Sequence, residues 1–293
     1  MNTTSSRSPV REIAAYLSLT YGVALAIALA LPDANINKLL SIFAPTVAVS
    51  ILTFTLVKKG ERRALWAGLG LRRVGLRTWP AALLLPFLLC GAAYGTALVI
   101  GAGDWAGADL SLAAVPDWIL NLVVSMAVMT VVILGEEIGW RGFLLPRVQE
   151  LTDKRRAAVL TGFAHGVFHL PLICIASTYD TGGSRWIAAP AAVVTITAGG
   201  VFYAWLRDRS GSIWPVAIAH NSVNTVFDIG ATLVVASSPA SLTYVAGETG
   251  FATLGACVVM AAVMLVRAKV WQTTQAPAAA PGGRKTAEVG AAG

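Results

Sequence analysis

Long apolar stretches, separated by short polar segments, run through almost the whole chain. The hydrocarbon core of a bilayer is about 30 Å thick, and a helix needs about 20 mostly apolar residues to cross it. About eight stretches have this length, at residues 13–31, 38–57, 79–100, 117–138, 157–176, 188–206, 213–236 and 248–267. The pattern predicts an all-α fold, a polytopic transmembrane helical bundle of about eight spans.

The composition agrees with a membrane protein. The 293 residues are 56% hydrophobic and 13% charged, whereas about a quarter of the residues of a soluble domain are charged. All three cysteines fall within expected spans, so we expect no disulfide framework. The composition therefore argues against a soluble globular fold.

The net charge of +7 reflects membrane topology. If the N-terminus lies in the cytoplasm, every Lys and Arg except Lys38 and Arg185 falls in a cytoplasmic segment, as the positive-inside rule requires. We therefore expect both termini in the cytoplasm, a multi-pass protein of the cell membrane, and contact with membrane lipids. Because topology accounts for the basic residues, we expect no nucleic-acid partner.

One membrane domain is expected over residues 1–269, with its polar motifs between about 130 and 230. Residues 270–293 are rich in Ala, Pro and Gly and contain few large apolar side chains. Such a segment cannot bury enough apolar surface to offset the entropy lost on ordering. We expect it to form a disordered cytoplasmic tail.

Three charged side chains stand where the fourth expected span approaches the cytoplasm, although each charge costs about 2.5–3.5 kcal/mol in the membrane interior. On a helix, Glu137 and Arg141 are four residues apart and can pair, while Glu136 points about 100° away. The pair is equally compatible with a structural role in which Arg141 extends to the lipid headgroups. Glu136 has no partner on its own helix and is a candidate functional residue.

All three histidines of the chain lie in expected spans. His165 and His169 share one helix face, and His220 shares another with Asn224 and Asp228. A spacing of four suits metal ligation, but a glycine follows His165 where zinc proteases of the His-Glu-x-x-His type carry their general base. Hydrogen bonding between helices is the plainer alternative for His165 and Asn224, and the favoured one for Asp228.

At these positions the sequence resembles the CPBP family of intramembrane proteases, which contains the CAAX prenyl protease type 2 enzymes and bacterial bacteriocin-processing and self-immunity proteins. The resemblance covers residues from about 130 to 230. The family's first motif, Glu-Glu-x-x-x-Arg, is matched by Glu136, Glu137 and Arg141. Its third motif, His-x-x-x-Asn or Asp, is matched by His220 and Asn224.

The second motif of the family, Phe-x-x-x-His, is matched only in part. The sequence His-Leu-Pro selects His169 as its histidine, but His165 stands in place of the phenylalanine. This departure leaves the role of His165 open.

The resemblance implies a CAAX-type intramembrane endopeptidase that cleaves a peptide bond with an activated water. It assigns the activation of that water to Glu136 and His169, and the stabilisation of the oxyanion to His220 and Asn224. An amide and an imidazole N–H are suitable oxyanion donors, and a carboxylate and an imidazole can share proton transfer.

The remaining polar residues of these spans have supporting or unassigned roles. Glu137 and Arg141 would fix the helix end and orient the neighbouring carboxylate. His165 and Asp228 stay candidates without an assigned function.

For the metal dependence of the reaction, the resemblance permits two mechanisms. We favour a glutamate-type mechanism without metal, because an asparagine is a poor zinc ligand but a good amide donor. The alternative is a zinc ion held by Glu136, His169 and His220 with a water as fourth ligand, and with His165 as an additional candidate.

Two other classes of function compete with a cytoplasm-facing endopeptidase acting on a membrane-associated protein or peptide. One is a transporter or proton relay that uses the same Glu, His and Asp residues. The other is a non-catalytic bacteriocin-immunity protein that binds a peptide without cleaving it.

Overall fold

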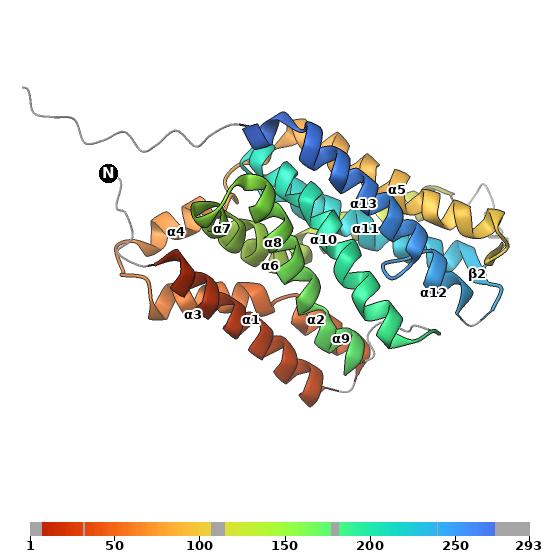
Figure 1. Ribbon diagram of the computed structural model, residues 1–293, viewed down its shortest axis with the longest axis horizontal. Helices are drawn as coiled ribbons and strands as arrows, with labels where there is room; N and C mark the ends of the chain where they lie inside the picture. The colour runs from red at the N-terminus through yellow and green to blue at the C-terminus, as the bar shows by residue number, and fades with distance from the viewer. Residues whose placement is uncertain (1–7, 32, 107–114, 177–181, 239, 273–293) are drawn as a thin grey trace, which may run out of the picture.

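The structure is a computed structural model that describes residues 8–31, 33–106, 115–176, 182–238 and 240–272. Within these residues the chain is almost entirely helical, as Figure 1 shows. The α-helices are α1 (Pro9–Ala30), α2 (Ala34–Ser41), α3 (Ala44–Thr55), α4 (Arg62–Gly68), α5 (Trp79–Val99), α6 (Val115–Glu137), α7 (Leu145–Leu151), α8 (Lys154–Phe168), α9 (Leu170–Cys174), α10 (Arg185–Ser210), α11 (Trp214–Leu233), α12 (Ser241–Val245) and α13 (Phe251–Arg267). The expected all-α fold is confirmed.

Three shorter helical segments and one small sheet complete the described structure. Two 3₁₀ turns, η1 (Leu76–Thr78) and η4 (Lys269–Gln272), precede α5 and follow α13, and the π-helix η3 (Ile138–Leu144) joins α6 to α7. Strands β1 (Gly103–Trp105) and β2 (Val234–Ala236) pair antiparallel and connect the ends of α5 and α11. The apolar pattern gave no sign of these two strands, which are only three residues long.

Local sequence explains where several helices begin and end. Asp33 and Asp153 cap α2 and α8, each accepting two backbone N–H groups with its side chain. The N–H of Arg156, followed by that of Arg155, lowers the pKa of the exposed Asp153. Gly211 ends α10 in the left-handed conformation at φ 66°, which a residue with a side chain rarely adopts.

Six helical segments are long and apolar enough to cross a membrane, so the chain is an integral membrane protein. They are Pro9–Ala30, Asn35–Thr55, Leu76–Val99, Val115–Leu151, Lys154–Cys174 and Arg185–Ser210. The seventh and eighth expected spans coincide with α11 and α13, which are not among the six, and α13 has only 17 residues. The count of eight and the cytoplasmic placement of the termini stay predictions.

The structure describes only the first three residues of the expected tail. Residues 270–272 belong to η4, where Trp271 is buried and donates its indole N–H to the carbonyl of Met264. The rest of the expected tail, residues 273–293, lies outside the described residues.

Helix α10 lies at the centre of the bundle, against α8, α11 and α13 (Figure 1). Its approach to α8 depends on glycine. A Cβ added at Gly200 would lie 2.6 Å from the Cα of Gly162, and one added at Gly166 would lie 2.8 Å from the carbonyl oxygen of Val193. Gly200 therefore permits close packing, which brings two helices that carry polar residues within side-chain reach.

Replacing Gly200 by alanine should force α8 and α10 apart, because the new methyl group meets backbone. We expect the free energy of unfolding to fall by about 1–3 kcal/mol, the usual cost of overpacking. Gly95→Ala in α5 is the matched control, since nothing lies within 4 Å of its added Cβ. Unfolding titrations in detergent micelles measure both, and equal stability of the two variants would contradict the importance of this contact.

Candidate active site

The expected pair of Glu137 and Arg141 is present and entirely buried. The NH1 group of Arg141 lies 3.2 and 3.3 Å from the two carboxylate oxygens of Glu137, and both side chains are 0% exposed. Arg141 therefore does not extend to the headgroups. It lies in the π-helix η3, a type of helix found mostly as short insertions at functional sites. The helix changes its hydrogen-bonding pattern directly after Glu137, at the point where the charges meet.

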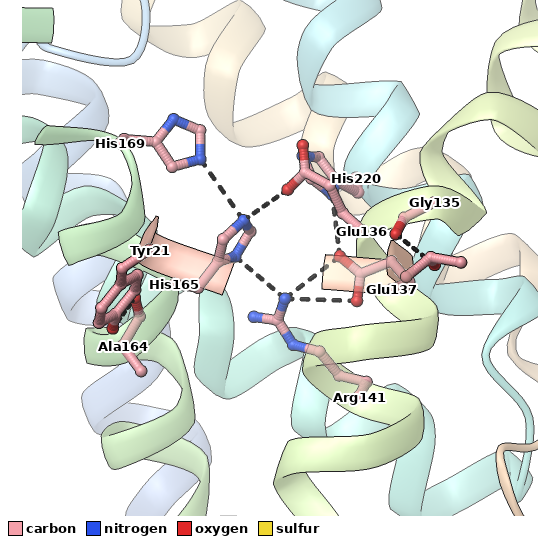
Figure 2. Close-up of polar contacts among 10 residues, drawn as sticks. Tyr21, Gly135, Glu136, Glu137, Arg141, Ala164, His165, His169 and His220 are labelled. Carbon is pink, nitrogen blue, oxygen red and sulfur yellow. Dashed lines mark hydrogen bonds and ion pairs between the residues drawn. The ribbon is translucent and has the colours of Figure 1, made fainter. Parts of the chain in front are cut away.

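His165 lies at the centre of the polar cluster in Figure 2. Its Nε2 is 2.8 Å from Oε2 of Glu136, and its Nδ1 is 3.1 Å from NH1 of Arg141. A guanidinium only donates hydrogen bonds, so Nδ1 must accept, and the ring proton of a neutral His165 is on Nε2, where it is donated to Glu136. Glu136, which had no partner on its own helix, thus has one on α8.

His169 and His220 reach the cluster from two further directions (Figure 2). His169 follows the last residue of α8, and its Nε2 lies 3.4 Å from Nε2 of His165. His220, on α11, has its Nδ1 2.9 Å from Oε1 of Glu137, and its ring stacks on Tyr203 of α10 at 5.6 Å between centroids. Both carboxylates of the first motif therefore contact a histidine from another helix.

Glu136, His169, His220 and Asn224, the four predicted catalytic residues, line one cavity of about 80 Å³. A cavity needs only about 10–15 Å³ of such volume to hold one water molecule. Lys38 and Glu248, from outside the motifs, line it as well. A water molecule therefore has room beside the carboxylate and the imidazole to which the resemblance assigns its activation.

Asn224 and Asp228 differ in their positions on α11. Asn224 lines the catalytic cavity, whereas Asp228 is exposed and lines a neighbouring cavity further along the helix. For neither side chain does the described part of the structure record a hydrogen bond to another helix. Asn221 forms that kind of contact instead, donating to the hydroxyl of Thr130 and to the carbonyl of Met126 on α6.

The side chains that could hold a zinc ion in this structure differ from the set that the sequence predicted. Ligand atoms of Glu136, His165 and His169 lie within 4.8 Å of one another, a group that has His165 in place of His220. A metal-bound histidine normally donates its other ring N–H to an acceptor. The other nitrogen of His165 faces the donor Arg141, so this arrangement does not fit a zinc ion bound through His165.

Sequence reasoning missed three residues that the structure adds to the site. Tyr203 stacks on His220 and lies 4.8 Å below the guanidinium carbon of Arg141. Trp140 packs against the ring of His165 at 4.9 Å. Glu248 lines the catalytic cavity from the segment before α13. The two aromatic residues had no signal beyond their nearness to motif residues, and Glu248 stands at the first position of the eighth expected span, far from the motifs in sequence.

A bundle of membrane-crossing helices with a buried cluster of Glu, Arg and His defines a class of protein that carries out polar chemistry inside the bilayer. Residues 117–226 match the family model of the type II CAAX prenyl endopeptidase Rce1-like proteins. The match confirms, for this segment, the resemblance to the CPBP family. The matched segment includes all three motifs and ends before Asp228. No curated protein matches the chain.

Replacing Arg141 by methionine should destabilise the protein strongly. The carboxylate of Glu137 would stay buried without its guanidinium partner, and breaking a buried ion pair in this way costs about 3–5 kcal/mol. The matched control is Arg156→Met, which removes an exposed partner of Asp153, and such surface pairs contribute about 0–1 kcal/mol. Comparable losses of unfolding free energy in the two variants would contradict a structural role for the buried pair.

Proposed function

We propose that the protein is an intramembrane endopeptidase that hydrolyses a peptide bond of a membrane-associated protein or peptide through a glutamate-type mechanism. The observation that carries this proposal is the single cavity lined by Glu136, His169, His220 and Asn224. The family-model match over residues 117–226 makes endopeptidase activity the expected chemistry. The substrate itself, and whether it is prenylated, are not part of this proposal.

In the proposed reaction, a water in the cavity loses a proton to Glu136 as its oxygen attacks the carbonyl carbon of the substrate. His169, which lines the same cavity, enters the reaction as an imidazolium and gives its proton to the leaving amine as the C–N bond breaks. The proton that Glu136 took from water then returns to His169, so both groups are restored. The amide of Asn224 and the Nε2–H of His220 stabilise the oxyanion. Because His220 already directs Nδ1 at Glu137, it donates from Nε2 as an imidazolium.

The charges of the cluster support this assignment. Two carboxylates face one guanidinium, so the buried group carries one excess negative charge until a histidine is protonated. Uncompensated charge is costly in a buried environment. An imidazolium at His220 neutralises the cluster and supplies the donor that the oxyanion requires.

We further propose that His165 is a positioning residue. The chain of contacts from Arg141 through His165 to Glu136 orients the carboxylate that accepts the proton from water. Arg141 thereby contacts Glu137 directly and Glu136 through one imidazole. Asp228 has no role in this mechanism.

Glu136→Gln should abolish cleavage without unfolding the protein, because the amide keeps the size of the side chain but cannot accept the proton. Asn224→Ala should lower kcat about 10²- to 10³-fold, the usual cost of one oxyanion donor. Peptidomics of membranes carrying each variant measures the cleavage, with exposed Glu150→Gln on α7 as the matched control.

Full activity of Glu136→Gln would contradict the endopeptidase proposal. Flux into proteoliposomes that depends on the same residues, without any cleavage, would identify a transporter or proton relay. A cellular phenotype that survives Glu136→Gln would identify a non-catalytic immunity protein.

His165→Gln should retain most activity, because its amide N–H can lie where Nε2 of the imidazole lies and its carbonyl can accept from Arg141. His165→Phe should lower kcat/KM about 10- to 100-fold, the range seen when a partner that orients a reacting group is removed. Elemental analysis and cleavage in excess chelator accompany the assay. Equal activity of the two variants would contradict the positioning role of His165. If the protein contained stoichiometric zinc and His165→Phe released it, His165 would be a zinc ligand and not the hydrogen-bond partner of Arg141 and Glu136.

A further inference from the structure

A second cavity adjoins the catalytic one. It has a volume of about 50 Å³, and its walls come mainly from α5, α10, α11 and α13, which pack against one another (Figure 1). Four residues line both cavities: His169, His220, Asn224 and Glu248. We call the second cavity the side pocket. It therefore begins at the groups to which the proposed mechanism assigns the leaving amine and the oxyanion.

The size of the side pocket limits what it can hold. Its volume of about 50 Å³ exceeds the roughly 10–15 Å³ that one water molecule needs, but it is about a third of the 150 Å³ of a cavity that binds benzene. A side chain of two or three heavy atoms therefore fits, whereas an aromatic side chain does not.

Gly199 of α10 contributes to this limit. A Cβ added at Gly199 would have nothing within 4 Å, whereas one added at the next residue, Gly200, would lie 2.6 Å from the backbone of α8. Packing between helices therefore does not require a glycine at position 199, where alanine would favour the helix more. Because Gly199 lines the side pocket, a methyl group at this position would occupy space in it.

Two buried threonines make the side pocket polar. Thr195 and Thr253 line it from α10 and α13, and they are 6% and 1% exposed. Neither hydroxyl has a hydrogen-bond partner among the described residues. By contrast, Thr197 of α10 donates its hydroxyl to the carbonyl of Val193, the common arrangement for a threonine within a helix.

Unpaired buried hydroxyls call for a partner, because buried polar groups are almost always hydrogen-bonded. Rotation about χ1 exchanges the methyl and hydroxyl groups of a threonine, and at Thr195 and Thr253 this rotation breaks no hydrogen bond. Both hydroxyls are therefore free to pair with a group in the side pocket. A hydroxyl there can donate to one threonine and accept from the other, whereas a hydrocarbon group leaves both unpaired.

We propose, on the basis of the proposed endopeptidase function, that the side pocket binds the side chain of one of the two residues that flank the cleaved bond, and that it selects serine or threonine there. The proposed oxyanion donors His220 and Asn224 line both cavities, and successive residues of an extended chain are only about 3.3–3.6 Å apart. Gly199, Thr195 and Thr253 are then specificity-determining residues.

Matched substrates test the selection. Peptidomics of membranes carrying the wild type or Glu136→Gln supplies the cleavage sites, and serine or threonine should be enriched at one fixed position beside the cut. Synthetic peptides of one such site then carry Thr, Val, Ser or Phe at that position. The kcat/KM for Thr should exceed that for its isostere Val about 5- to 150-fold, the effect of leaving a buried hydrogen-bonding group unpaired, and the Phe peptide should resist cleavage.

Equal kcat/KM for the Thr and Val peptides would show that water alone pairs with the two hydroxyls, and would overturn the proposal. Cleavage sites with large side chains at both flanking positions would overturn it as well.

Replacing the pocket threonines tests the source of the preference. Thr195→Val and Thr253→Val keep the size of the side chain and remove the hydroxyl, so each should reduce the preference for the Thr peptide, and the double variant should bring it close to one. Thr161→Val on α8 is the matched control, because Thr161 is also 1% exposed and unpaired within the described residues but does not line the side pocket. A preference that survives the double variant would contradict the role of the two threonines.

Gly199→Ala tests the size limit. The added methyl group should lower kcat/KM for the Thr peptide about 10- to 200-fold, the effect of one carbon in a fitted pocket, and should affect the smaller Ser peptide less. The matched control is Gly255→Ala on α13, an exposed position where an added Cβ also has nothing within 4 Å. Equal losses for the two peptides would contradict a size limit at Gly199.

These outcomes separate the side pocket from the endopeptidase function. Cleavage that disappears in Glu136→Gln but shows no selection at either flanking position would contradict only the side pocket. The absence of any cleavage that depends on Glu136 would contradict the endopeptidase function, and the role of the side pocket with it.

Discussion

The buried guanidinium of Arg141 is the group on which the rest of the site depends. It neutralises Glu137 directly, contacts His165, and lies over the ring of Tyr203, so it touches two helices besides its own. In a low-dielectric interior such a charge is tolerated only with close partners. Glu136 is linked to it through His165, and His220 through Glu137.

The backbone is built to let these side chains meet. The π-helix after Glu137 widens the chain where Arg141 is placed, and Gly162 and Gly200 let α8 approach α10 closely. A Cβ at Gly200 would lie 3.2 Å from NH2 of Arg141, so this glycine also leaves space for the guanidinium. The same glycine therefore permits both the close packing of α8 and α10 and the burial of the guanidinium.

Hydrolysis inside a membrane requires that water reach a site otherwise surrounded by apolar side chains. Within the described residues, connected cavities reach the polar cluster, and packed aromatic and aliphatic side chains lie beside it. The chain thus combines the motifs of the CAAX endopeptidase family with cavities that reach the polar cluster. The departure at His165 adds a contact to Glu136 that a phenylalanine at this position would not provide.

The sequence by itself determined the helical bundle, the family, and the pairing of Glu137 with Arg141, because all three depend on local periodicity and short-range spacing. Tertiary structure alone decided that His165 contacts Glu136, that His220 contacts Glu137, and that Glu248 joins the site. These residues come from separate helices, and their meeting depends on how closely the helices pack and on which side space is left. A linear pattern contains neither quantity, so these contacts became visible only when the helices were assembled.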